Sequence, residues 1–253
     1  MRKRDGSGWT LTETIPVLEI FGPTIQGEGM VAGRKTMFVR TAGCDYACSW
    51  CDSAFTWDGS AKDEIVQMNK DAIWQALNEE AEGLFSHVTI SGGNPALLKN
   101  LGSFITLLKE KAIDVALETQ GSVWQDWFTT IDDLTISPKP PSSRMETDFG
   151  VLDDIMTRLR EAGRSSQVSL KVVIFDEEDL AYARRVKTRY PDVPFYLQVG
   201  NDDTVTDEDK TLRDHLMDRY EWLINETMGD AAFNDAYVLP QIHALLWGNR
   251  RGV

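Results

Sequence analysis

Short apolar runs, many of them rich in β-branched residues, recur along the chain and alternate with longer segments of helical spacing. The apolar runs predict strands at Pro16–Phe21, Thr36–Arg40, His87–Ser91, Val115–Glu118, Leu134–Ser137, Val168–Phe175 and Phe195–Val199. The helical spacing predicts helices at Ala72–Ala81, Pro95–Lys111, Leu152–Ala162 and Leu180–Tyr190. This alternation is typical of a parallel α/β sheet with right-handed crossovers, in a doubly wound sheet or a full or partial (β/α) barrel.

Polar segments follow four of the predicted strands at the point where each strand ends. They are Ser91–Pro95, Glu118–Gly121, Ser137–Pro140 and Gln198–Asn201. Because the carboxyl ends of parallel strands meet at one edge of an α/β fold, we expect these segments to surround a single pocket. Each segment taken alone is also compatible with an ordinary turn, since Gly, Pro, Ser and Asn favour turns.

The composition, with 42% hydrophobic and 26% charged residues, is that of an ordinary globular protein. No apolar run approaches the roughly 18–20 residues that span a bilayer, and the N-terminal sequence lacks the apolar core of a secretory signal. We therefore expect a cytoplasmic protein that binds no membrane. We also expect residues 1–253 to form a single domain, with 1–14 as a flexible extension and 240–253 as a C-terminal segment near the active site.

The formal net charge of −14 argues against a general nucleic-acid-binding protein, because binding to phosphates requires an excess of Lys and Arg. The acidic residues crowd into Asp176–Asp179 and Asn201–Asp209. We interpret these segments as solvated loops and helix faces.

The three cysteines of the chain, Cys44, Cys48 and Cys51, lie within eight residues. A structural zinc site requires four ligands, commonly Cys and His, but the three histidines are distant in sequence. We interpret the histidines as packing or surface residues; they are His87, His215 and His243. Thiolates also hold [4Fe–4S] clusters, and three thiolates for four irons leave one iron open to an outside ligand. The spacing favours such a cluster, and a cysteine-based metal-binding or redox-sensing module is the non-enzyme alternative.

Cys44-x₃-Cys48-x₂-Cys51 resembles the signature of the radical S-adenosylmethionine superfamily, and Ser91–Pro95 resembles its Gly-Gly-Glu-Pro element. The resemblance implies a partial (β/α) barrel with parallel strands and an open side, in which S-adenosylmethionine chelates the unique iron. A glycine pair lets the backbone approach that ligand closely. The chain has Asn94 where Glu is common in the superfamily. A contact between main-chain carbonyls and the amino group of S-adenosylmethionine would be kept, whereas a contact between a Glu carboxylate and that amino group would be lost.

The same resemblance implies further cofactor contacts around the cysteines and at the strand ends. The candidate cofactor-binding residues are Trp50, Asp52, Gly92, Gly93, Glu118, Ser137, Lys139, Gln198 and Asn201. Trp50 and Trp57 flank the third cysteine, where they either cover the cluster from solvent or simply pack the loop. Asp45 and Asp52 add negative charge or accept hydrogen bonds from loop amides.

A narrower resemblance covers nearly the whole chain. Glu19–Gly29, ahead of Phe38-Val39-Arg40, is similar to the 7-carboxy-7-deazaguanine synthase family, as are Ile136–Pro141 and Leu246–Val253. That family converts 6-carboxy-5,6,7,8-tetrahydropterin to 7-carboxy-7-deazaguanine with loss of ammonia, on the route to queuosine and other deazapurines. The resemblance implies a carbon–nitrogen lyase in which a radical abstracts hydrogen from C6 of the substrate and S-adenosylmethionine is regenerated.

This resemblance also suggests how a pterin is bound. Gln26 and Glu28 offer amide and carboxylate groups to the amide and amidine edge of the pterin, and Arg40 suits the substrate carboxylate. Alternatively, Arg40 forms an ordinary ion pair and Gln26–Gly29 is a plain turn. We expect the terminal carboxylate of Val253 to fold toward the pterin amino group, with Arg250-Arg251 as a lid or a solvated tail. The candidate substrate-binding residues are Ile25, Gln26, Gly27, Glu28, Arg40, Ser91 and Val253.

Mg²⁺ is implied near the substrate carboxylate, held by the residue two positions after the third cysteine. That residue is often Thr in the family and is Ser53 here, which keeps the hydroxyl. Alternatively, the Ser53 hydroxyl caps the loop. The expected partners are a flavodoxin- or ferredoxin-like electron donor and a second copy in a homodimer, with no nucleic acid. The alternative enzyme is a glycyl-radical-enzyme activase, which requires no pterin-shaped contacts.

Overall fold

The computed structural model describes residues 14–253, so the expected extension at 1–14 lies outside the described residues except for its last position. The described residues form one sheet in the order β3-β1-β2-β4-β5-β6-β7-β8-β9. Its strands are β1 (Ile15–Ile25), β2 (Lys35–Thr41), β3 (Val66–Met68), β4 (His87–Gly92), β5 (Asp114–Thr119), β6 (Asp133–Ile136), β7 (Val168–Ile174), β8 (Phe195–Val199) and β9 (Tyr237–Leu239). The helices are α1 (Lys70–Ala81), α2 (Leu101–Glu110), α3 (Phe149–Glu161), α4 (Glu177–Arg189), α5 (Asp209–Met228) and α6 (Ile242–Trp247).

Neighbouring strands from β2 to β9 are all parallel, as the alternation of strands and helices predicts. The first strand is an exception to the predicted parallel pattern, because β1 runs antiparallel to both β2 and β3. Since β3 and β9 end the order at opposite edges, the described sheet is open rather than closed. The predicted fold class, an α/β partial barrel with an open side, is confirmed.

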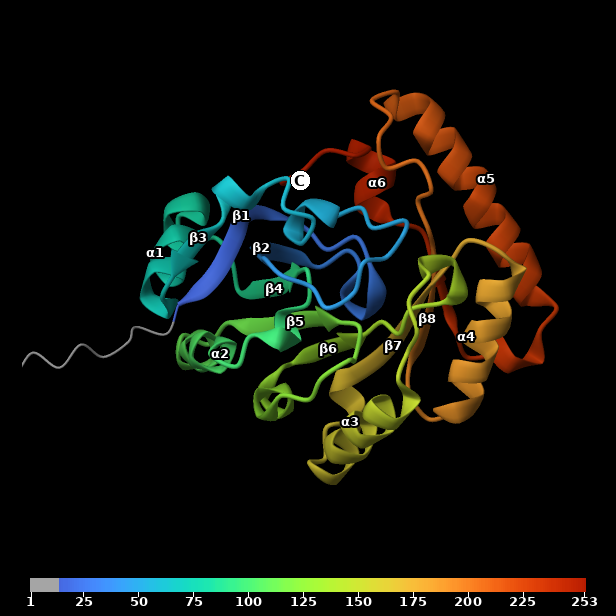
Figure 1. Cartoon of the computed structure of the whole chain (residues 1–253), viewed down its shortest axis with the longest axis horizontal. Coiled ribbons are helices and arrows are strands. Elements are labelled where there is room, and N and C mark those ends of the chain that lie inside the picture. The colour runs from blue at the N-terminus through green and yellow to red at the C-terminus, as the bar shows by residue number, and fades with distance from the viewer. Residues whose placement is uncertain (1–13) are drawn as a thin grey trace, which may run out of the picture.

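Figure 1 shows helices α1 to α5 arranged around the outer side of the curved sheet, with α6 and the loop after β2 on its inner side. The helices bury their apolar stripes against the sheet. In α1 the fully buried Ile73 and Leu77 are four residues apart and share a face, and Leu101, Ile105 and Leu108 do the same in α2. This core fixes the strands, and the loops at their carboxyl ends are left to form a site.

The predicted helix Pro95–Lys111 is divided into a short 3₁₀ turn at Pro95–Leu97 and α2. The interpretation of Asp176–Asp179 as solvated is wrong for Asp179, which is fully buried. Its carboxylate accepts hydrogen bonds from the main-chain N–H groups of Ser142 and Phe175, at 3.0 Å each. Asp179 therefore joins the loop after β6 to the end of β7, which is an internal role that its position in an acidic run does not reveal.

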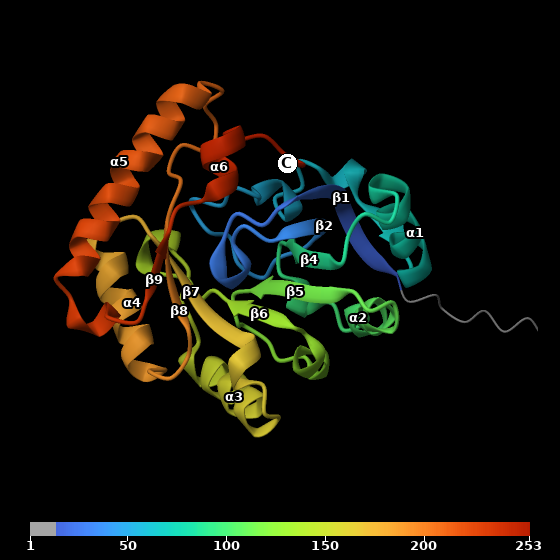
Figure 2. The ribbon, with the colours of Figure 1, turned by 180° about the vertical axis from the view of Figure 1, so that it is seen from behind.

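The C-terminal segment returns to the open side of the barrel. In Figures 1 and 2 the chain leaves β9, forms α6 and ends beside the loop that follows β2. Arg251 marks this return, because its guanidinium ion-pairs with Glu19 of β1 and with Glu64. None of the helices in the described residues is both long and apolar enough to cross a membrane.

Candidate active site

A cavity of about 230 Å³ lies at the carboxyl ends of the parallel strands. The four polar segments that follow β4, β5, β6 and β8 all contribute to its wall, together with the cysteine loop and the C-terminal segment. The candidate residues that line it are Ile25, Gln26, Gly27, Glu28, Arg40, Cys44, Cys48, Trp50, Cys51, Asp52, Ser53, Ser91, Gly92, Gly93, Glu118, Ser137, Lys139, Asn201 and Val253. Residues separated by more than 200 positions in sequence therefore meet in one site.

The cysteine loop presents three free thiols to this cavity, all of them partly buried. Burial raises the pKa of the Cys48 thiol to about 11 and also raises the pKa values of Cys44 and Cys51. Each thiol is therefore protonated at neutral pH while no metal is bound. It loses its proton when it binds iron, because the thiolate is the metal-binding form. The loop is positioned from below by a hydrogen bond from the Gly43 N–H to the Thr56 carbonyl, at 2.8 Å.

Gly92 and Gly93 pack directly beneath the cysteine loop. A Cβ atom on Gly92 would lie 2.0 Å from the Thr41 carbonyl oxygen, and one on Gly93 would lie 2.1 Å from the Gly43 carbonyl oxygen. Gly92 also has a φ of +127°, which L side chains rarely adopt. The sequence suggests that the glycine pair leaves room for a ligand, and the structure shows that it also leaves room for the loop that carries Cys44.

A buried charge cluster forms the opposite part of the wall. Lys171, which is 3% exposed, points from β7 between the carboxylates of Glu28 and Glu118, with its Nζ 3.0 Å from Glu118 Oε2 and in direct contact with Glu28 Oε2. Burial raises the pKa of Glu28, but the Lys171 ammonium, together with His243 and the hydrogen bond from Gln241, outweighs burial and lowers that pKa to about 2. Burial lowers the pKa of Lys171, and the two carboxylates together raise it above its ordinary value. Glu28 and Lys171 are therefore both charged at neutral pH.

Residues after β9 complete this charged wall. Gln241 Nε2 donates to Glu28 Oε1 at 2.7 Å, whereas the buried Gln241 Oε1 has no hydrogen-bond partner among the described residues. His243 Nε2 lies 4.0 Å from Glu28 Oε1, and the His243 ring contacts the backbone of Gly27. An unsatisfied buried acceptor is costly unless a ligand supplies a donor, so the Gln241 amide marks a place where a ligand N–H fits.

Arg40 and Ser53 meet at the base of the cysteine loop. The Arg40 guanidinium donates from Nε to Glu19 Oε2 at 2.8 Å and from NH1 to Ser53 Oγ at 3.0 Å. The Ser53 hydroxyl donates to Asp52 Oδ1 at 2.9 Å. Both Arg40 and Ser53 line the cavity, so the guanidinium is part of an ion pair and still faces the site.

Comparison with known proteins agrees with this combination of a cysteine loop and a polar wall. The chain is 65% identical to the 7-carboxy-7-deazaguanine synthase of Bacillus subtilis (strain 168) over 243 residues, which cover 96% of the chain and 100% of the relative. The chain belongs to the 7-carboxy-7-deazaguanine synthase family. The synthase of Bacillus cereus is 63% identical to this family member, over 94% of the chain and 99% of the relative.

Two further comparisons concern the cluster and the fold. A family model described as a 4Fe-4S single cluster domain matches residues 25–136, which contain all three cysteines. The crystal structure of QueE from Escherichia coli aligns with a TM-score of 0.65 at 20% identity, covering 94% of this chain and 100% of that one, and this likeness shows the fold. The family, the lyase activity and the [4Fe–4S] cluster with S-adenosylmethionine, all predicted from the sequence, are therefore confirmed.

The residues present fit the cofactors of the synthase family. Three free thiols, the donor type that iron–sulfur clusters require, line one cavity within a single loop. Beside them the glycine pair exposes main-chain groups, and Ser137 and Lys139 add a hydroxyl and an ammonium. Lys139 Nζ lies 3.3 Å from Ser137 Oγ and 5.8 Å from the Trp50 ring centroid. These groups suit a zwitterionic, aromatic ligand such as S-adenosylmethionine.

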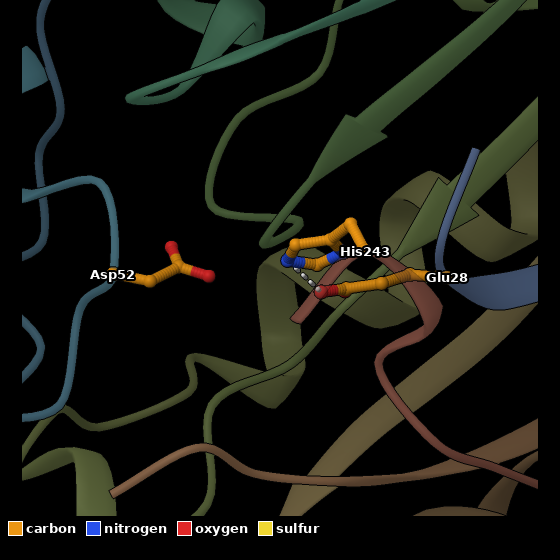
Figure 3. A group of neighbouring side chains, drawn as sticks. All are labelled: Glu28, Asp52 and His243. Carbon is orange, nitrogen blue, oxygen red and sulfur yellow. Dashed lines mark ion pairs between the residues drawn. The ribbon is translucent and has the colours of Figure 1, made fainter. Parts of the chain in front are cut away.

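Glu28, Asp52 and His243 approach one another across the cavity (Figure 3), with one potential ligand atom from each within 4.8 Å of the other two. Figure 3 shows Asp52 pointing from the cysteine loop toward the pair formed by His243 and Glu28. Because both oxygens of Glu28 already accept hydrogen bonds from Lys171 and Gln241, this trio is a weaker cation site than its spacing suggests.

Three predicted cofactor-binding residues have other partners in the structure. Gln198 is fully buried and lies outside the cavity wall, where it accepts from the Gly29 N–H and donates to the Leu239 carbonyl, at 3.4 Å each. Glu118 does line the cavity, but it is held by Lys171 and by Gln26 Nε2 at 3.4 Å. Asn201 also lines it and donates to Asn249 Oδ1 at 2.9 Å.

Gln120 lies on the wall within the predicted strand-end segment Glu118–Gly121, whereas the sequence assigned no role at the site to three other wall residues: Lys171, Gln241 and His243. The interpretation of His243 as a packing or surface residue did not foresee its place on the cavity wall. Lys171 carried a usable signal, because it is the one charged residue in the otherwise apolar and hydroxyl-bearing strand Val168–Ile174. Gln241 and His243 lie in the segment 240–253 that was expected near the active site, but no pattern within that segment assigned either residue a role.

Proposed function

We propose that the chain converts 6-carboxy-5,6,7,8-tetrahydropterin to 7-carboxy-7-deazaguanine with loss of ammonia, in the biosynthesis of queuosine and other deazapurines. One observation carries this proposal. A single cavity has three free thiols on one side and the ion-paired Glu28–Lys171–Glu118 cluster on the other. The thiols suit the cluster of a radical enzyme, and the charged cluster suits a ligand rich in N–H donors such as a reduced pterin.

Cys44, Cys48 and Cys51 would hold the cluster, and Gly92, Gly93, Ser137 and Lys139 would contact S-adenosylmethionine. When bound, these cofactors supply the radical that abstracts hydrogen from C6 of the substrate. Trp50 packs on Phe175 with ring centroids 5.0 Å apart, and both residues line the cavity, so their rings would cover part of it from solvent. A dry site protects a reactive radical from side reactions.

On the other side of the cavity, Glu28 acts as a fixed hydrogen-bond acceptor. Its depressed pKa keeps the carboxylate ionised, so Glu28 accepts hydrogen bonds from the pterin amidine edge and donates no proton. Gln241 Oε1, which accepts no hydrogen bond within residues 14–253, adds a second acceptor beside it. Together with Gln26 and the main chain of Ile25 and Gly27, these groups would read the edge of the pterin ring.

The substrate carboxylate would lie between Arg40 and the cysteine loop. Arg40 offers a guanidinium that the Glu19 ion pair holds in place. Mg²⁺ would join the carboxylate to the chain through Ser53, and Asp52 Oδ1, 2.9 Å from Ser53 Oγ, would add a second oxygen of the kind that Mg²⁺ prefers. To bind the ion, Ser53 would give up its hydrogen bond from Arg40, which frees that guanidinium for the substrate.

The remaining features of the proposal rest on the resemblance to the family. The protein would act in the cytoplasm as a homodimer of single-domain chains, with residues 240–253 beside the active site and Val253 near the substrate. A flavodoxin- or ferredoxin-like protein would supply the electron. Light scattering after size-exclusion chromatography measures the assembly, and a monomeric mass at working concentrations would contradict the homodimer.

The decisive experiment is anaerobic turnover of reconstituted protein with 6-carboxytetrahydropterin, Mg²⁺ and substoichiometric S-adenosylmethionine. We expect several molecules of deazapurine per molecule of S-adenosylmethionine, because the cofactor is regenerated. Glu28→Gln should raise KM for the pterin while leaving the cluster intact. The activity of a glycyl-radical-enzyme activase would not depend on this substitution, because such an enzyme binds no pterin. An intact cluster without any deazapurine product would overturn the proposal.

A further inference from the structure

Two of the three cysteines receive side-chain N–H groups from outside the Cys44–Cys51 segment. Trp57 Nε1 donates to Cys51 Sγ at 3.4 Å, and Gln120 Nε2 donates to Cys44 Sγ at 3.8 Å. Trp57 follows the 3₁₀ turn Ala54–Thr56, and Gln120 follows β5. Among the described residues no comparable side-chain donor reaches Cys48. These contacts distinguish two of the thiols from the third.

A polar network holds the Gln120 amide in place. Gln120 Nε2 also donates to Asp45 Oδ1, which accepts a second hydrogen bond from Asn94 Nδ2 at 2.9 Å. Asn94 is fully buried and its remaining groups are occupied: Nδ2 donates to Ser122 Oγ at 3.0 Å, and Oδ1 accepts from Thr119 Oγ1 at 2.8 Å. Asn94 therefore connects the ends of β4 and β5 to the cysteine loop.

This network gives a reason for asparagine at position 94. An asparagine amide donates to the Asp45 carboxylate, whereas a glutamate at the same buried position would place a second carboxylate beside it and repel it. The Asn94 side chain faces Asp45 and Ser122, so its contact is with the loop that carries Cys44. Asn94 thus acts on the cluster ligand through Asp45 and Gln120.

We propose that Trp57 and Gln120 set the reduction potential of the cluster through their N–H groups on Cys51 and Cys44, and that Asn94 is the positioning residue for Gln120. Reduction adds negative charge to the cluster and its thiolates. An N–H dipole aimed at a thiolate sulfur stabilises that added charge and raises the potential. The chain in this way makes its cluster easier to reduce than three thiolates alone would allow. This inference rests on the cluster of the proposed function.

The test measures the ratio of reduced to oxidised cluster by electron paramagnetic resonance at a fixed applied potential, without substrate. Trp57→Phe and Gln120→Leu should each lower that ratio about tenfold, which corresponds to about 59 mV for one electron. The matched controls are Trp124→Phe and Gln75→Leu, which remove an indole bonded to Asp126 and an amide bonded to Glu79, both outside the cavity wall. Both controls should leave the ratio unchanged.

Asn94→Leu tests whether Asn94 positions the Gln120 amide or only stabilises the cysteine loop. It should lower the ratio as Gln120→Leu does, and combining the two changes should add nothing further, because Asn94 acts only through the hydrogen bond from Gln120 to Cys44, which Gln120→Leu removes. A reduced fraction within twofold of the unchanged protein in the fully iron-loaded Trp57 and Gln120 variants would overturn the inference.

Poor iron loading of a variant is addressed by a second form of the protein. Replacing the Trp57 indole with its benzothiophene analogue keeps the bicyclic shape and substitutes sulfur for the N–H donor, and it should give the same fall in the ratio. An unchanged ratio in that form contradicts the role of Trp57. If the unchanged protein assembles no cluster at all, both this inference and the proposed function fail, whereas a normal cluster with unshifted variants removes only the inference.

Discussion

Lys171 is the buried cation on which the polar wall of the cavity depends. Replacing it in Lys171→Met leaves the Glu28 and Glu118 carboxylates facing each other without a counter-ion. Removing one partner of a buried ion pair costs about 3–5 kcal/mol, so we expect a loss of unfolding free energy of that size at pH 7, measured by urea denaturation. Lys187→Met is the control, because Lys187 is also buried but pairs with the exposed Asp235. An equal loss in both variants would contradict the special role of Lys171.

The ion pair between Lys171 and Glu28 should make the free energy of unfolding depend on pH. The pKa of Glu28 is lowered from 4.5 to about 2 in the folded chain, so its contribution to stability is present above pH 4.5 and is lost as the pH falls toward 2. In Lys171→Met the pKa of Glu28 should instead rise, because burial and Glu118 both oppose its charge. We therefore expect the stability difference between the two proteins to shrink from pH 7 to pH 3. A constant difference across that range would contradict this account.

Ser53 tests the proposed magnesium site at the level of one atom. Ser53→Ala removes the hydroxyl, and we expect it to raise the Mg²⁺ concentration for half-maximal turnover by roughly tenfold or more. Ser53→Thr keeps the hydroxyl and should stay close to the unchanged protein. The measurement is the initial rate against Mg²⁺ concentration. If Ser53→Ala keeps its Mg²⁺ response, the hydroxyl only caps the loop through its bond to Asp52.

At the scale of elements, the end of β4 is built around a close approach to β2. Gly92→Ala should destabilise the chain well beyond a left-handed backbone cost of about 1–2 kcal/mol, because its Cβ would collide with the Thr41 carbonyl. Gly83→Ala is the matched control, since Gly83 also has a positive φ but nothing lies within 4 Å of its added Cβ. Thermal melting and iron content measure the effect. If Gly92→Ala and Gly83→Ala lose equal stability, the positive φ alone explains why position 92 is glycine.

Elements with strong apolar patterns were predictable, and those without were not. The seven predicted strands all exist, because each buries a run of apolar side chains. Helix α5 was missed because its buried residues, Leu212, Leu216, Leu223 and Thr227, are sparse in a charged sequence that looks solvated. The strands β3 and β9 are three residues long, which is too short for any periodicity to register.

For the molecule as a whole, Arg251 fastens the C-terminal segment across the open side of the barrel. Its guanidinium lies 4.0 Å from the Phe55 ring centroid and ion-pairs with Glu19 and Glu64. Arg251→Ala should raise KM for the pterin several-fold with little change in thermal stability, because partly exposed ion pairs contribute at most about 1 kcal/mol. Arg158→Ala, which removes an exposed ion pair and a contact with Trp124, is the control. An unchanged KM for Arg251→Ala would show that the C-terminal segment keeps its place at the cavity without the contacts of Arg251.

The sequence by itself determined the chemistry of the cysteine loop and the alternation that makes a parallel sheet, because spacing within eight residues and periodicity within a strand are local properties. It also indicated the strand-end segments that meet in the cavity, since parallel strands end at one edge. Only the tertiary structure decided the partners of each side chain. Lys171 between Glu28 and Glu118, and Gln241 and His243 beside Glu28, depend on contacts between residues 53 to 215 positions apart, which no local pattern encodes.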